Sequence, residues 1–465
     1  MTTLVPVALA LALAQAPAEN PPPRAPAAEA TAPAPAPSAQ PAAPVLTLDE
    51  ALRLADERNL DLKAAAARLR QAQQATWKAW AGYLPQVTAQ ATYTRNGEAV
   101  NIPFPTSLTT PPPITALPAQ ESQELVFSNI TVVPEEQLQG QVDATQVLFS
   151  PALWFGIQAA SRGVDVADIS VQGARRDILF GTAQAFYGVA SLRQATQVSE
   201  RLLEIAQRQE KDARVRFQAG TIAKVGLLRA EIDRARAEQD LRRARNSYES
   251  ARIGLATLLD RPVDFEVADP PEPKPTLQPA QLEADALRER TDVRAARRTL
   301  DAVRAAHHAQ IGRYFPNLAA FGHYQNANVA GLTGKELWSV GLSLQWRLLD
   351  GGLREADLRE AGARVDEAAA NVAIAEARAR AEVRQSLLDL ESARANAEKA
   401  REQRDLATEN QRLVDVSYRA GAATAVEQAD ATAALRNAEL AQQAETLAAQ
   451  LAALRVLRAA GGTLR

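Results

Sequence analysis

The chain has 465 residues, with 52 basic and 55 acidic side chains and a net charge of −3. A nucleic-acid-binding protein would show a clear basic excess, so this balance argues against nucleic acid as a partner. The chain has no cysteine, which excludes disulfides, thiolate zinc sites and a cysteine nucleophile.

The first residues predict an export signal. The apolar run Leu4 to Ala14 is too short to span a bilayer, and small residues suited to signal-peptidase cleavage follow it. We expect a signal peptide over 1–16, against the alternative of an incidental Ala/Leu-rich tail. Residues 17–46 hold ten of the 27 prolines, mixed with alanine, and predict a disordered spacer because this composition cannot bury a core. No later stretch is apolar enough for a transmembrane helix.

The rest of the chain contains the same pattern twice. Tyr83-Leu84-Pro85 matches Tyr314-Phe315-Pro316 at an offset of 231 residues. Phe217 to Gly220 matches Tyr418 to Gly421 at an offset of 201. The order is conserved between the copies, and the offset changes only once, so the first copy carries about 30 extra residues between its two expected strands.

Each copy predicts a helix, two strands, a long helix, a sharp turn and a second helix. We expect repeat 1 over 47–260, beginning at the capping-box pattern Thr47 to Glu50, and repeat 2 over 281–461, with a proline-rich linker over 261–280 between them. The helices are predicted from proline-free stretches rich in strong helix formers, and the long helices would be roughly 100 Å in length. The expected helices after the strands are 152–217 and 222–258 in repeat 1, and 353–419 and 425–460 in repeat 2.

Four segments alternate between apolar and polar residues and predict strands over 86–95, 138–149, 317–326 and 338–349. One apolar and one polar face is typical of a membrane β-barrel strand, although a soluble sheet packed on one side would show the same pattern. Trp338 and Trp346 lie about 26 Å apart along one face, close to the height of a lipid-facing band. The expected membrane-girdle aromatics are Tyr93, Tyr324, Trp338 and Trp346.

Four strands are too few to close a barrel, because the smallest membrane barrels use eight. The barrel must then be shared between chains, and two or three chains would give eight or twelve strands. The proline-rich loop 96–136 carries the extra residues of repeat 1, and we expect it at the extracellular rim.

This doubled pattern resembles the outer-membrane factor family, the TolC-like efflux and secretion channels. The resemblance is carried by Leu48 to Leu52, Tyr83 to Pro85, Arg216 to Gly220, Trp338 to Leu342, Leu349 to Gly352 and Tyr418 to Gly421. It implies a mainly α-helical fold with a small membrane β-barrel contribution: two structural repeats, each with two β-strands plus long antiparallel helices. It also implies a homotrimer in which a 12-stranded β-barrel lies in the outer membrane of a Gram-negative cell. A 12-helix α-barrel would continue it into the periplasm, where the channel would work with an adaptor protein and an inner-membrane pump.

The resemblance also implies two functional regions at the periplasmic end. The turns at Gly220, Thr221, Gly421 and Ala422 are similar to the surface that meets the adaptor. Glu427 and Asp430 match positions where acidic residues ring the narrowest opening, although Thr424 and Glu427 also form a capping-box pattern. Copy one has Val225-Gly226-Leu227 where the family often has an acid, and Ala423 replaces a basic residue, so the family's polar latch is not expected here.

The residues suggest no enzyme, no cofactor and no metal site. The three histidines, His307, His308 and His323, lack a carboxylate cluster in the sequence, and no catalytic arrangement stands out. We therefore expect a passive outer-membrane conduit of a tripartite efflux pump or a type I secretion system, carrying drugs, metals or proteins. The alternative is a non-conducting periplasmic helical rod or adaptor with a structural role.

Overall fold

The computed structural model describes residues 44–109, 124–275, 278–331 and 334–462. The expected signal peptide and nearly all of the expected spacer lie outside these residues. Val45 and Leu46, at the end of that spacer, form the short strand β1 (Val45–Leu46), and Leu46 is buried. The spacer prediction was therefore too long at its C-terminal end, because an apolar pair there has a strand partner.

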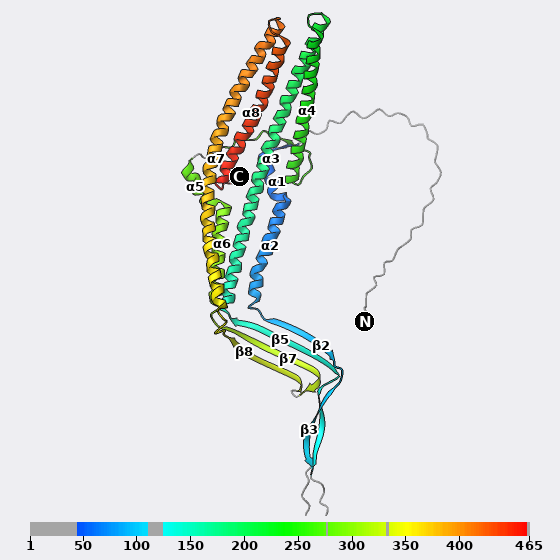
Figure 1. The fold of residues 1–465 in the computed structure, drawn as a ribbon, viewed down its shortest axis with the longest axis vertical. Coiled ribbons are helices and arrows are strands. Elements are labelled where there is room, and N and C mark those ends of the chain that lie inside the picture. Colours follow the sequence, from blue (N-terminus) through cyan, green and yellow to red (C-terminus); the bar gives the residue numbers. More distant parts are fainter. Residues whose placement is uncertain (1–43, 110–123, 276–277, 332–333, 463–465) are drawn as a thin grey trace, which may run out of the picture. The chain divides into compact units, whose positions relative to one another are not determined.

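Six of the described elements in each half of the chain occur in the same order (Figure 1). In the first half they are α1 (Leu48–Arg58), α2 (Leu60–Ala81), β2 (Gln86–Arg95), β5 (Glu136–Phe149), α3 (Pro151–Gln218) and α4 (Lys224–Leu258). In the second half they are α5 (Pro279–Glu289), α6 (Thr291–Gly312), β7 (Asn317–Gly331), β8 (Gly334–Gln345), α7 (Leu353–Arg419) and α8 (Ala425–Ala459). In each half the long helix packs along the helix that follows it. None of the described helices has an apolar stretch suited to crossing a membrane.

The single helix expected at the start of each copy is broken in the structure. In copy one, Asn59 adopts φ −52° and ψ 128°, outside the helical region, and separates α1 from α2. Its side chain accepts hydrogen bonds from the backbone N–H groups of Asp61 and Leu62, at 2.9 and 3.2 Å, and so caps α2. Arg290 marks the matching break between α5 and α6. The apolar spacing continues across both breaks, which is why it predicted one helix.

The expected inter-repeat linker, 261–280, also contains regular structure. The strand β6 (Glu266–Val267) lies within it and pairs in parallel with β1. Pro279 is the first residue of α5, where its missing N–H costs nothing because first-turn amides have no helical partner. Phe265 and Val267 are fully buried, and they belong to a hydrophobic cluster that this segment forms with α1, α3 and α4.

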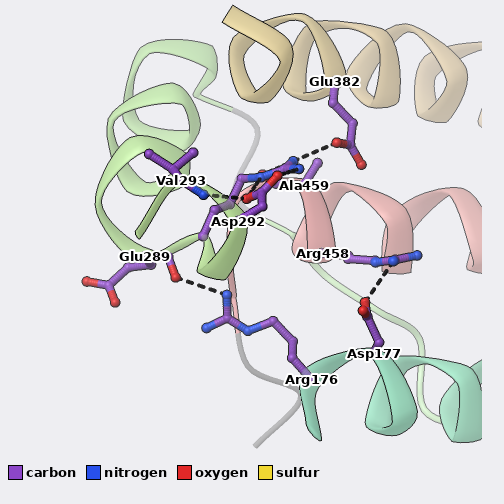
Figure 2. Close-up of polar contacts among 9 residues, drawn as sticks. Arg176, Asp177, Glu289, Asp292, Val293, Glu382, Arg458 and Ala459 are labelled. Carbon is purple, nitrogen blue, oxygen red and sulfur yellow. Dashed lines mark hydrogen bonds and ion pairs between the residues drawn. The ribbon is translucent and has the colours of Figure 1, made fainter. Parts of the chain in front are cut away.

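A second hydrophobic cluster lies where α5 and α6 pack against α7 and α8. Polar contacts surround it (Figure 2). Asp292 and Glu382 both pair with the Arg290 guanidinium, at 2.8 and 2.7 Å, and Arg458 pairs with Asp177 at 2.7 Å. Arg176 donates to the backbone carbonyl of Glu289 at 3.0 Å. These contacts join α3 to α5 and to α8, and the α5–α6 junction to α7.

The four strands near the helix ends form one antiparallel sheet in the order β2-β5-β7-β8. The strand expected over 338–349 instead spans Gly334–Gln345. Gln345 pairs with Asn317, the first residue of β7, so the ladder ends where its partner strand begins. The strands expected over 317–326 and 138–149 are longer in the structure, because β7 and β5 extend to Gly331 and back to Glu136.

The loop expected over 96–136 contains a β-hairpin. The strands β3 (Val100–Thr109) and β4 (Glu124–Val133) pair with each other and form a separate two-stranded sheet. Pro103 and Pro105 favoured a loop in the sequence. A proline is nevertheless tolerated in a strand that has a free edge, because its missing N–H need not serve the ladder.

Candidate functional site

The main sheet has one strongly apolar face. Trp338, Val340 and Leu342 on β8 are 69, 73 and 68% exposed, and they alternate with the small residues Ser339 and Gly341. The cross-strand partners of the apolar row on β8 are Tyr324, Gly322, Ala320 and Leu318 on β7. Large apolar side chains exposed in a contiguous row mark a surface that contacts lipid or another protein.

The opposite face of the same sheet is polar and carries an ionisable pair at its centre. Thr88, Asp143, His323 and Ser339 are consecutive cross-strand partners on β2, β5, β7 and β8. The His323 Nδ1 atom donates to Asp143 Oδ1 at 2.6 Å, and Gln141 donates to Asp143 Oδ2 at 2.6 Å. A sheet that is apolar outside and polar inside is typical of a barrel around a water-filled bore.

The first and last strands of the sheet each have a free edge. Within the described residues, β2 pairs only with β5, and β8 pairs only with β7. Unpaired edge N–H and C=O groups are costly in hydrocarbon, because no water is present there to bond them. The sheet therefore needs partners at both edges if it lies in a membrane.

The expected girdle aromatics occupy two different settings. Tyr324 and Trp338 are direct cross-strand partners on the apolar face, and Tyr93 is opposite Leu138 on the same face. Trp346 lies one residue beyond β8 and donates its indole N–H to the carbonyl of Tyr314 at 3.1 Å. Its expected position inside a strand was wrong, because the ladder of β8 ends at Gln345, opposite the first residue of β7.

Sequence reasoning missed an aromatic group where the helices meet the sheet. Trp80, near the end of α2, packs edge-on against Trp154 at the start of α3, with ring centroids 6.4 Å apart. Tyr83 is also near Trp80 and donates its hydroxyl to the carbonyl of Ser150 at 2.8 Å. Both tryptophans are exposed, as membrane-interface aromatics are. The available signal was their position within a few residues of a helix–strand boundary.

The two turns expected to meet an adaptor have the same backbone geometry. Gly220 and Gly421 adopt φ values of +72° and +77°, which glycine accepts without steric cost. Thr221 N–H bonds the carbonyl of Arg216 at 2.9 Å, and Ala422 N–H bonds that of Ser417 at 2.8 Å. This is the Schellman helix ending, and it leaves all four predicted turn residues exposed.

The turns of the two copies are also linked to each other. The Arg216 guanidinium lies 4.5 Å from the centre of the Tyr418 ring and donates to the Tyr418 carbonyl at 3.3 Å. A cation over an aromatic ring is attracted by its electron-rich face. This contact ties the end of α3 to the end of α7.

The two candidate gate residues differ in what their carboxylates do. Glu427 accepts from the backbone N–H of Thr424 at 2.7 Å and from its hydroxyl at 2.9 Å, which completes a capping box. The Thr424 amide, followed by its hydroxyl, holds the pKa of Glu427 below its usual range. Asp430 is exposed and has no hydrogen bond or ion pair to any described residue. Glu427 therefore caps its own helix, and the carboxylate of Asp430 is exposed without such a role.

The histidines lie on two different elements. His307 and His308 are in α6, and the His308 ring packs against Phe155 with centroids 5.7 Å apart. Only His323 is on the sheet. Among the described residues, no three His, Asp or Glu side chains are grouped to hold a metal ion.

Known proteins show the same architecture. A crystal structure of the outer membrane protein VceC from Vibrio cholerae aligns with a TM-score of 0.70 at 19% identity, over 90% of this chain and 97% of that chain. A crystal structure of a membrane protein from Pseudomonas aeruginosa aligns with a TM-score of 0.70 at 20% identity, over 91% of this chain and 92% of that one. At these identities the likeness concerns the fold.

Two comparisons rest on sequence. The cobalt-zinc-cadmium resistance protein CzcC of Cupriavidus metallidurans is 30% identical over 169 residues, which is 35% of this chain and 39% of that protein. The family model for outer membrane efflux proteins matches residues 51–261 and 282–463. Because this match covers both copies of the repeat, the chain belongs to the outer membrane efflux protein family.

Proposed function

We propose that three copies of this chain form a passive outer-membrane channel through which an efflux system exports its cargo. The observation that carries this proposal is the four-stranded sheet, with an apolar face, a polar face and two free edges. Strands β2 and β8 of neighbouring subunits would pair, since their directions make that pairing antiparallel. Three subunits supply the twelve strands that the family resemblance implies.

The helical region would continue the bore below the membrane. In each half, α2 or α6 lies before the sheet and the long helix lies after it, so every strand of the main sheet connects to a helix at the same end. The turns at Gly220 and Gly421 lie at the far ends of the long helices. There they would contact a periplasmic adaptor, which couples the channel to an inner-membrane pump.

The cargo that we propose is a divalent transition-metal cation. Support comes from CzcC, a protein named for cobalt, zinc and cadmium resistance, to which this chain is 30% identical over 39% of the length of CzcC. Asp430, with its free carboxylate near the turn, would favour cations at the periplasmic opening. The other interpretation, a non-conducting rod or adaptor, explains the helices but gives no role to a sheet with one lipid-like face.

Conductance tests this function directly. The purified protein, inserted from detergent into a planar bilayer in potassium chloride, should give discrete current steps. In gels it should run as an oligomer without heating and as a monomer after boiling. A matched variant, Val340→Arg, places a charge on the apolar face, which costs about 2–4 kcal/mol at mid-membrane, and it should reduce insertion and current. A soluble monomer without current would contradict the proposal.

A further inference from the structure

We propose that His323 and Gln325 form a transient binding point for a transition-metal cation on the wall of the bore, with Asp143 orienting the histidine. This inference rests on the proposed channel function and adds a site within it. The expected absence of a resident metal site is a separate matter, because the cation here would be passing cargo.

The orientation of the His323 imidazole favours metal binding. A carboxylate can only accept, so the 2.6 Å contact between His323 Nδ1 and Asp143 Oδ1 places the proton on Nδ1. In the neutral imidazole the other nitrogen, Nε2, then carries the free lone pair, and this is the form that binds metals. Gln141 holds the second Asp143 oxygen at 2.6 Å and keeps the carboxylate in place. A histidine backed by a carboxylate in this way is a common support for metal ligation.

A second ligand atom lies at a suitable distance from the imidazole. Gln325 Oε1 lies 3.4 Å from His323 Nε2, which is long for a hydrogen bond. Two ligands about 2.1 Å from one metal ion, at a tetrahedral angle, are about 3.4 Å apart. The pair thus has the spacing of two neighbouring ligands, and water would complete the coordination. Imidazole nitrogen suits Zn²⁺ and Co²⁺ better than Mg²⁺.

The pair is accessible from solvent. The His323 and Asp143 side chains are 27 and 38% exposed on the polar face of the sheet. In the proposed barrel that face lines the bore, and three subunits would supply three such points. One imidazole and one amide bind weakly, which suits a conduit, since conduction needs an ion to bind and then to leave.

The test measures how strongly added metal ions block the potassium current through the wild-type channel. Zn²⁺ should reduce the current at concentrations where Mg²⁺ has little effect. His323→Gln removes the free imidazole and should raise the half-blocking Zn²⁺ concentration by at least about tenfold, and Asp143→Asn should raise it by about tenfold through loss of orientation. Gln325→Ala leaves the His323–Asp143 pair intact and should give a smaller increase in the half-blocking Zn²⁺ concentration. It tests the site if the other variants fail to assemble.

Two controls separate this site from others. His307→Gln, in α6, should leave Zn²⁺ block unchanged. Asp430→Asn should change Zn²⁺ and Mg²⁺ effects alike, because it removes charge rather than a nitrogen ligand.

The outcomes are distinct. A channel that conducts potassium, with equal Zn²⁺ block in wild type and all three site variants, overturns the inference and leaves the proposed function standing. In that case the His323–Asp143 pair only ties β7 to β5. A protein that gives no current overturns both.

Discussion

Asn59 and Arg290, which interrupt the first helix of each copy, each donate a hydrogen bond to a carbonyl at the end of a later helix. The two side chains are chemically different. In copy one, the Asn59 side-chain amide donates to the carbonyl of Leu258, at the end of α4, at 2.9 Å. In copy two, Arg290 donates to the carbonyl of Ala459, at the end of α8, at 3.3 Å. Asn59 and Arg290 are 231 residues apart and the two carbonyls are 201 apart, as the repeat requires.

The difference lies in what else each side chain contacts. Asn59 is buried and neutral, and its oxygen also caps α2. Arg290 caps nothing, but its guanidinium pairs with Asp292 and Glu382 (Figure 2). Duplication thus preserved the backbone position and the docking carbonyl, while one copy came to rely on a neutral hydrogen bond and the other on ion pairs.

The largest expected effect is that of Arg290→Ala. It leaves Asp292 and Glu382 without their shared partner and frees the carbonyl of Ala459. We expect a loss of about 2 kcal/mol in unfolding free energy, below the usual range for a broken buried pair because both carboxylates are half exposed. Chemical unfolding of the detergent-solubilised protein measures it. The exposed Arg288→Ala serves as control, and an equal loss in both variants would contradict the role of Arg290.

Asn59→Ala should have the next largest effect. It removes the cap of α2 and the bond to Leu258, and we expect a loss of about 1 kcal/mol in the same assay. Asn59→Asp keeps the capping oxygen and loses only the donor, so it should retain part of that stability. If Asn59→Asp lowered the stability as much as Asn59→Ala, the cap of α2 would not be the main contribution of Asn59 to stability.

Low pH should weaken the α5–α6 junction at Arg290 but not the α1–α2 junction at Asn59. Burial acts to raise the pKa of Asp292, but the Arg290 hydrogen bonds and charge outweigh it and hold the pKa below its usual range. A carboxyl with a depressed pKa stabilises the fold above its unfolded pKa, about 3.9, and loses that contribution as pH falls through the folded value.

Two variants measure this pH dependence. Stability followed by unfolding between pH 6 and pH 3 should fall less steeply in Asp292→Asn than in wild type. Asn59→Asp provides the comparison in copy one, because it adds a carboxyl at the junction that is normally neutral. Parallel curves for wild type and Asp292→Asn would show that other groups set the acid response.

The smallest effect on stability is expected just after the turns at Gly220 and Gly421, where the two copies differ in charge. Asp430 is matched in copy one by Arg229, at an offset of 201, and both are exposed. Asp430→Ala should lower cation selectivity and Arg229→Ala should raise it, with little change in unfolding. Reversal potentials in a salt gradient measure both. An unchanged potential in Asp430→Ala would reject its assignment to the gate.

Much of the helical fold could be predicted from composition and repeat. The helix α7 spans Leu353–Arg419, the range expected from a proline-free run of strong helix formers. Asn59 escaped prediction because the apolar spacing continues through it and only its backbone angles reveal the break. The β3–β4 hairpin escaped because its prolines resemble those of a loop.

The candidate site could be predicted only in part. The alternation of apolar and polar residues predicted the two faces of the sheet, because successive side chains of a strand point to opposite sides. The pairing of His323 with Asp143 depends on the register between β5 and β7, strands that are 180 residues apart at these positions, and no local pattern encodes it. The capping-box pattern of Thr424 and Glu427 already set Glu427 apart from Asp430 in the sequence, and the hydrogen bonds of Glu427 confirm that pattern.

The central claim is that β2 of one subunit pairs with β8 of the next, and cysteine cross-linking tests it most directly because the chain has no cysteine of its own. Thr88→Cys on β2 should be combined in turn with cysteine at Ser339, Gly341 and Ser343 on β8. At least one pair should give covalent trimers in non-reducing gels. Gln139→Cys with Ser343→Cys, on strands that are not neighbours in the proposed barrel, should give none. Monomers from every β2–β8 pair in the membrane-inserted protein would contradict the account.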